Sequence, residues 1–393
     1  MAFFDLPTSA GALTGGHRLP GEIPAADDSR TASRARPSLQ AAPVTVLWEL
    51  TQRCHLDCTH CYLGDKSFRD ELDFPQARRV LEILRQAGSF LLILTGGEPT
   101  LHPHFDAIAQ AAFAMEFAPT LFTAAGNLTA ERRRFIGSLP WMQIEVSLLG
   151  GGAGGRDHDR IARREGAFRR TLDDVAYWRS LGRQVVLKTV VWKDNREEIA
   201  RLKEIADELG CALKASPFLM HRTDTHAATG LQPEASAEVR RELLENLAAI
   251  EFLQRGGVSA CDGSLVSGAT PGSGPHSAEQ ALLCGAGRKA WALAPNADVF
   301  PCNILRIPCG NLLRQPWEEI WFSEPMVGVR SVQVADVHGC TGCGVMSHCK
   351  RCPGQAWLES GDYRNRAQAN CEIASARAIR AGAEVVEPFP LGA

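Results

Sequence analysis

The chain has 393 residues, of which 45% are hydrophobic and 22% are charged, and its formal net charge at pH 7 is −3. This is an ordinary globular composition, long enough for two domains with sizeable cores. No long basic run is present, which argues against a nucleic-acid partner, and no apolar stretch is long enough to cross a membrane. The N-terminal sequence lacks the basic and apolar regions of a secretory signal, so we expect a cytoplasmic protein.

The predicted elements begin after a segment without periodicity. Residues 1–42 are rich in Gly, Pro, Ala and Ser, and we expect a disordered leader there. Residues 43–255 then alternate between short apolar strands and amphipathic helices. The predicted strands are 44–50, 90–94, 120–123, 142–148, 184–191 and 212–217, and the predicted helices are 73–88, 105–115, 130–136, 168–181, 196–209 and 236–253. This alternation predicts an α/β fold with a parallel sheet, here a partial (β/α)6 barrel whose chemistry collects at the C-terminal ends of the strands.

The pattern changes in the last third of the chain. Residues 256–275 are rich in Gly, Ser and Pro and are predicted to form a linker. Residues 276–385 are predicted to form a small cysteine-rich domain, in which short strands at 290–294 and 299–301 flank a turn. A region so poor in regular apolar pattern needs additional stabilisation, which metal clusters would supply.

The thirteen cysteines indicate metal chemistry. Without an export signal they should be reduced, and their short spacings favour metal ligands over disulfides. A buried structural thiol is the better interpretation for Cys211, which stands alone. Cys54, Cys58 and Cys61 form a C-x3-C-x2-C motif at the end of the first predicted strand, followed by Tyr62. Three thiolates hold three corners of a cubane iron–sulfur cluster and leave the fourth iron open to bind and act on a ligand.

A second motif follows the second predicted strand. Gly96, Gly97, Glu98 and Pro99 combine glycines, which allow the backbone to approach a ligand, with groups that accept from an ammonium. On its own, this run is better explained as a simple strand-to-helix turn. Its place after the second strand, behind the cysteine motif, favours a binding role.

Together these motifs resemble those of radical SAM enzymes with a C-terminal SPASM-type domain, over about residues 44–380. The resemblance implies that Cys54, Cys58 and Cys61 ligate a [4Fe–4S] cluster whose open iron binds S-adenosylmethionine. It also implies that Tyr62 lies beside the adenine and that residues 96–99 contact the methionine amino group.

Further positions follow from the resemblance. Ser147, at the end of the fourth strand, matches a family serine near S-adenosylmethionine. Lys188 lies on the fifth strand, where a cation can meet the methionine carboxylate; a lysine whose stem packs while its head reaches solvent is an equal alternative. The run 156–159 (Arg-Asp-His-Asp) resembles a family loop, either structural or substrate-facing. The run 124–127 (Ala-Ala-Gly-Asn) departs from the usual Thr-Asn-Gly, so a ribose contact there would be made differently.

The C-terminal cysteines carry another motif, C-x2-C-x5-C-x2-C. Paired C-x2-C units also bind zinc, but zinc ribbons separate their pairs by ~15–20 residues, so the five residues here favour iron–sulfur clusters. The family pattern implies two auxiliary [4Fe–4S] clusters. Cys284, Cys302 and Cys352 would ligate the nearer one, and Cys340, Cys343, Cys349 and Cys371 the other. Cys309 or Cys261 would supply the fourth ligand of the nearer cluster, or that iron would stay open to bind substrate.

Two details argue against sulfatase maturation. Asn303 stands where sulfatase-maturing members carry an acidic residue, and the extra nearby cysteine of those members is absent.

The resemblance implies an activity. Such an enzyme reductively cleaves S-adenosylmethionine to a 5′-deoxyadenosyl radical, and we expect it to modify oxidatively a side chain of a ribosomally made peptide or a protein. One alternative is a cofactor-biosynthesis enzyme acting on a small molecule such as a tetrapyrrole, and another is a non-enzymatic electron carrier. The expected partners are an external electron donor such as flavodoxin or ferredoxin and a separate leader-peptide-binding protein, because the first 42 residues are too few for a leader-recognition domain.

Overall fold

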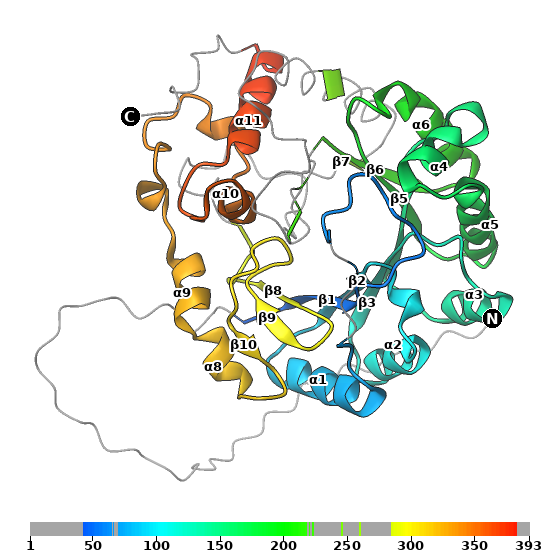
Figure 1. Cartoon of the computed structure of the whole chain (residues 1–393), viewed down its shortest axis with the longest axis horizontal. Coiled ribbons are helices and arrows are strands. Elements are labelled where there is room, and N and C mark those ends of the chain that lie inside the picture. The colour runs from blue at the N-terminus through cyan, green and yellow to red at the C-terminus, as the bar shows by residue number, and fades with distance from the viewer. Residues whose placement is uncertain are drawn as a thin grey trace, which may run out of the picture. The chain divides into compact units, whose positions relative to one another are not determined.

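Strand β1 (Thr45–Thr51) lies within a ten-stranded sheet whose order is β10-β9-β8-β1-β2-β3-β4-β5-β6-β7. Strands β1 to β6 are neighbours in chain order and pair in parallel, which confirms the predicted partial barrel (Figure 1). The computed structural model describes residues 42–64, 66, 70–217, 220, 222–223, 245–246, 259–260 and 284–382. The predicted leader, the helix at 236–253 and the linker therefore lie almost entirely outside the described residues.

The elements have the following bounds. The other strands are β2 (Leu91–Gly96), β3 (Ala118–Thr123), β4 (Gln143–Ser147), β5 (Val185–Val190), β6 (Ala212–Ser216), β7 (Ser259–Ala260), β8 (Ala290–Leu293), β9 (Asp298–Phe300) and β10 (Gly310–Asn311). The helices are α1 (Phe74–Gln86), α2 (Phe105–Ala114), α3 (Ala130–Ser138), α4 (Arg156–Ala162), α5 (Ala167–Ser180), α6 (Ile199–Glu208), α8 (Trp317–Trp321), α9 (Glu324–Ser331), α10 (Pro353–Ser360) and α11 (Gln368–Arg380). None of these described helices has the length and apolar character that a membrane span requires.

Helix α1 shows how local sequence sets an element. Asp73 caps its N-terminus in a reciprocal capping box with Gln76, which satisfies backbone donors that the first turn leaves unpaired. Val80 and Leu84 lie one turn apart and are fully buried. Gly88, just beyond the end of the helix, adopts a positive φ of +84°, a conformation that costs glycine little.

The two faces of the sheet differ in chemistry. Alternate side chains such as Trp48, Leu94 and Val146 enter the main apolar core, which they share with the helices on the outer side of the sheet (Figure 1). The intervening positions of the same strands carry polar side chains, among them Glu49 and Glu145. The inner face of the partial barrel therefore carries buried polar side chains that the outer face lacks at these strands.

The C-terminal region joins the same sheet, which the sequence did not predict. Strand β8 pairs in parallel with β1, from Thr45 opposite Ala290 to Trp48 opposite Leu293. The predicted hairpin is confirmed, since β8 pairs antiparallel with β9. The described residues of the partial barrel and of the cysteine-rich region thus belong to one compact unit.

One expected loop is helical, and four helices were not predicted. The run 156–159 is not a loop but the first turn of α4, which begins after Gly155 at a φ of +90°. Seven residues are too short for an apolar stripe to reveal the helix, although Ile161 and Ala162 are completely buried. Helices α8 to α11 also escaped prediction, because their apolar periodicity is weak.

Candidate functional site

The cysteine triplet lies in the loop that follows β1. Burial raises the pKa of Cys54 to about 11 and that of Cys58 to about 12. The charges of Cys54 and Cys61 also raise the pKa of Cys58, so the structure brings the three thiols together. Binding to iron would deprotonate these thiols and remove the mutual repulsion of their thiolates.

The Gly-Gly-Glu-Pro loop (residues 96–99) packs directly on the backbone that leads into the triplet. The N–H groups of Gly97 and Glu98 donate to the carbonyl oxygens of Thr51 and Arg53, both at 2.8 Å. A Cβ on Gly96 would lie 2.2 Å from the carbonyl oxygen of Thr51, and one on Gly97 would lie 2.5 Å from that of Arg53. The glycines therefore allow the two predicted motifs to contact each other through their backbones.

Glu98 ties this loop to the next strand. Its carboxylate, 1% exposed, accepts from the N–H and hydroxyl of Thr100, the hydroxyl of Thr123 and the N–H of Ala124. Burial raises the pKa of Glu98, and these hydrogen bonds oppose the shift. Because Ala124 begins the run that departs from the family pattern, Glu98 holds that run in place through its backbone.

Helix α4 supports the cysteine loop from the other side. The N–H groups of Asp57 and Thr59 donate to the carbonyl oxygens of Ala162 and Ile161, at 3.1 and 3.0 Å. Arg163, which ends the helix in a left-handed conformation, donates to the Asp57 carboxylate at 3.0 Å. The unpredicted helix is thus a main support of the candidate cluster loop.

Ser147 and Lys188 lie side by side in the register of β4 and β5. The side chain of Lys188 is 24% exposed, and its Nζ lies 2.9 Å from a carboxylate oxygen of Glu145 and 3.7 Å from the ring centre of Phe122. Lys214 on β6 contacts the other oxygen of Glu145 at 2.5 Å. Two ammonium groups thus share one carboxylate, which leaves this group of three side chains with a net positive charge. Sequence analysis missed Glu145 and Lys214, for which a charged residue inside each strand was the available signal.

Tyr62 links the triplet to the C-terminal region. Its hydroxyl donates to Glu49 at 3.1 Å, and Arg306 Nη2 donates to both oxygens of the same carboxylate at 2.6 and 2.7 Å. Burial and the charge of Glu49 raise the pKa of Tyr62 well above its usual value. Sequence reasoning missed Glu49, although an acidic residue inside an apolar strand was the available signal.

The C-terminal cysteines form two groups. The first auxiliary group contains Cys284, Cys302 and Cys352, and the second contains Cys340, Cys343, Cys349 and Cys371. Burial raises the pKa of Cys302 to about 12, and the charges of Cys352 and Cys284 add to the shift. Burial likewise raises the pKa of Cys371 to about 12, with Cys349, Cys340 and Cys343 as charged neighbours. The structure therefore brings together the members of each predicted ligand set.

The remaining cysteines differ in their surroundings. Cys309 and Cys211 are buried in the main apolar core, whereas Cys284 and Cys302 pack against a separate apolar cluster. The Cys309 thiol contacts the carbonyl oxygen of Ile307 at 3.3 Å, and no thiol of the described residues contributes to its pKa shift. This placement fits a structural thiol better than a cluster ligand. Cys261 lies outside the described residues.

The candidate donor sets consist of thiols alone. Within the described ranges, no three His, Cys, Asp or Glu side chains come close enough to hold one metal ion. A mononuclear zinc site, with Zn–S bonds of ~2.3 Å, would bring its thiolates within about 4 Å of one another. A cubane is larger and binds each thiolate to a different iron. The seven auxiliary cysteines and the triplet are all-thiol sets, and thiolates are the donors that [4Fe–4S] clusters take.

Comparison with known families gives the class of the protein. Residues 48–206 match the model of the radical SAM superfamily, and residues 284–353 match SPASM, an iron–sulfur cluster-binding domain. The chain belongs to the radical SAM enzymes that carry a C-terminal SPASM domain. This membership sets aside the electron-carrier alternative.

Relatives in sequence and solved structures of similar fold cover most of the chain. The AdoMet-dependent heme synthase of Methanosarcina barkeri is 28% identical over 339 residues, covering 82% of this chain and 94% of the relative. The mycofactocin maturase MftC of Mycobacterium ulcerans is 24% identical over 320 residues, covering 80% and 82%. Streptococcus suis SuiB bound to S-adenosylmethionine superimposes with a TM-score of 0.65 at 17% identity, covering 84% of this chain and 77% of SuiB. SuiB bound to its precursor peptide SuiA gives 0.63 at 16% identity, covering 84% and 76%.

Proposed function

We propose that the chain is a maturase that oxidatively modifies a side chain of a peptide or protein. The observation that carries this proposal is the set of three cysteine groups, one of them an incomplete triplet beside the Gly-Gly-Glu-Pro loop. The triplet would hold the core cluster, and the two auxiliary groups would hold two further clusters. The likeness to SuiB, which has been captured with a precursor peptide, supports a peptide substrate.

When bound, the core cluster and S-adenosylmethionine supply a one-electron reductive cleavage that yields a hydrogen-abstracting 5′-deoxyadenosyl radical. The chain's own residues position the reactants. Tyr62, the Gly-Gly-Glu-Pro loop, Ser147 and Lys188 would line the S-adenosylmethionine site at the C-terminal ends of the strands. The Glu98 hydrogen bonds keep the loop and the end of β3 rigid, so that the reacting atoms keep their alignment.

A tetrapyrrole-modifying activity is the second candidate. The alignment with the heme synthase covers 94% of that relative's length. The net positive charge of the group in which Lys188 and Lys214 share Glu145 also suits a substrate that carries several carboxylates.

The test uses anaerobically reconstituted protein with dithionite and S-adenosylmethionine. One arm adds short synthetic peptides chosen from the open reading frames that neighbour the gene, and the other adds an iron porphyrin with propionate side chains. The maturase proposal predicts 5′-deoxyadenosine in stoichiometric proportion to a mass loss in the peptide. Turnover of the porphyrin alone would overturn it in favour of the second candidate, and Cys54→Ala should abolish either reaction.

A further inference from the structure

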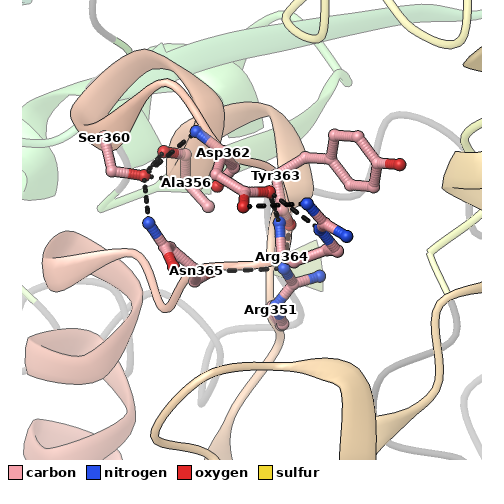
Figure 2. A network of polar contacts seen from close by, with 7 residues as sticks. All are labelled: Arg351, Ala356, Ser360, Asp362, Tyr363, Arg364 and Asn365. Carbon is pink, nitrogen blue, oxygen red and sulfur yellow. Dashed lines mark hydrogen bonds and ion pairs between the residues drawn. The ribbon is translucent and has the colours of Figure 1, made fainter.

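Arg351 lies between the two auxiliary cysteine groups. It occupies the two-residue gap between Cys349 of the second group and Cys352 of the first. Only 8% of the residue is exposed. Its guanidinium Nη2 donates to the carbonyl oxygens of Tyr363 and Asn365, the latter at 3.2 Å (Figure 2). These neutral acceptors leave the buried positive charge uncompensated.

No carboxylate of the described residues contacts Arg351, and its buried Nε has no hydrogen-bond partner there. Burial lowers the pKa of Arg351, and the thiolates that oppose this shift come from both groups. They are Cys340 and Cys349 of the second group and Cys284 and Cys352 of the first. A buried cation of this kind needs an anionic partner, which thiolate-ligated clusters would provide.

The positive charges of other arginines near these cysteines lower thiol pKa values in one group each. Arg366 lowers the pKa of Cys340 and of Cys371, both of the second group. Arg288 lowers the pKa of Cys284, which belongs to the first group. In the part of the chain that the structure describes, Arg351 is the buried arginine whose charge reaches both groups.

A short turn holds the guanidinium in place. The turn follows α10, the helix that Cys352 caps with its thiol. The Asp362 carboxylate accepts from the N–H of Arg364 at 2.8 Å, and the Asn365 side chain donates to the Ser360 hydroxyl at 3.1 Å (Figure 2). These contacts fix the two carbonyl oxygens that orient Arg351. A single guanidinium nitrogen, Nη2, donates to both acceptors.

We propose that Arg351 is a shared positioning residue that sets the reduction potentials of both auxiliary clusters together. The inference rests on the cluster assignment of the proposed function. A fixed positive charge stabilises the more negative, reduced form of a cluster, so it makes both clusters better electron acceptors. That property suits the acceptance of the electron released when the substrate radical is oxidised to product.

The test is an EPR-monitored redox titration of the anaerobically reconstituted full chain. The variants are Arg351→Gln, which removes the charge, and Arg351→Lys, which keeps it. Arg364→Gln is the matched control, because it removes a charge of the same network whose side chain is 54% exposed. The core cluster signal is recognised by its change on addition of S-adenosylmethionine.

We expect Arg351→Gln to shift both auxiliary potentials to more negative values by at least a tenfold change in the ratio of reduced to oxidised cluster, which is 59 mV for one electron. The reduction potential of the core cluster should shift by less than this in Arg351→Gln. All three potentials should shift by less than this in Arg351→Lys and in the Arg364→Gln control. A shift of one auxiliary cluster alone, of all three clusters or of none would overturn the inference.

Iron counts separate this inference from the cluster assignment. If the wild-type chain holds about twelve irons and Arg351→Gln leaves the auxiliary potentials unchanged, only this inference is overturned. If the wild-type chain holds about four irons, the assignment of the two auxiliary clusters is overturned as well. If Arg351→Gln loses iron, Arg351→Lys decides. If Arg351→Lys keeps its iron and both auxiliary potentials, the role of the charge is supported. If Arg351→Lys loses them, that role is contradicted.

Discussion

Replacing Arg306 with glutamine should destabilise the protein strongly, because it breaks the ion pair between β1 and the SPASM region. Glu49 is 1% exposed, and Arg306 Nη2 contacts both of its carboxylate oxygens. The variant leaves a buried carboxylate without its cation, and breaking a buried pair in this way costs about 3–5 kcal/mol. For a chain of this length, that loss corresponds to a decrease in Tm of about 4–6 °C.

The assay is thermal unfolding of the anaerobic, cluster-loaded protein followed by circular dichroism. The matched control is Arg201→Gln, which removes an arginine that is 45% exposed and paired with Glu204 and Glu208, and should cost far less stability because exposed ion pairs contribute little. The double variant with Glu49→Gln should recover most of the loss, because it removes the unpaired charge. The reasoning is refuted if Arg306→Gln is as mild as the control, or if the two changes at the ion pair simply add.

Three further predictions concern single positions. Gly96→Ala should prevent assembly of the core cluster, because the new Cβ would meet the Thr51 carbonyl oxygen at 2.2 Å; iron analysis should show a loss of about four irons per chain, and full iron would contradict this. Burial lowers the pKa of His158 to about 4 from 6.5, so the unfolded chain binds more protons between these values and stability falls as the pH drops through that window. His158→Asn should therefore weaken the loss of stability between pH 6.5 and 4 by up to about 3 kcal/mol, measured as Tm against pH, and an unchanged slope would count against it. Cys371→Ala should lower the iron content by about four per chain while 5′-deoxyadenosine formation persists, and retention of all iron would remove this cysteine from the second group.

The sequence predicted the elements whose signals are local. Strands β1 to β6 are short apolar runs in chain order, so their alternation with amphipathic helices was sufficient to predict a parallel sheet. The triplet also follows from its short spacing, whereas the division of the C-terminal cysteines into two groups, with Cys352 in the first and Cys371 in the second, came from the family resemblance.

The sequence did not predict the contacts between distant segments. Glu49 and Arg306 are 257 positions apart, and the pairing of β8 with β1 joins segments almost as distant. Such pairings depend on which surfaces meet after the elements form, and no local periodicity records them. Arg351 was missed for a related reason: its importance comes from two groups of cysteines that meet around it only in the folded chain.

The central claim is that the incomplete cysteine triplet after β1 activates S-adenosylmethionine. The most direct measurement is the amount of 5′-deoxyadenosine that the dithionite-reduced, iron-loaded protein forms from S-adenosylmethionine, with Cys54→Ala in parallel. We expect formation by the wild-type chain and none by the variant. An iron-loaded wild-type chain that forms no 5′-deoxyadenosine, or a variant that forms as much as the wild type, would contradict the account.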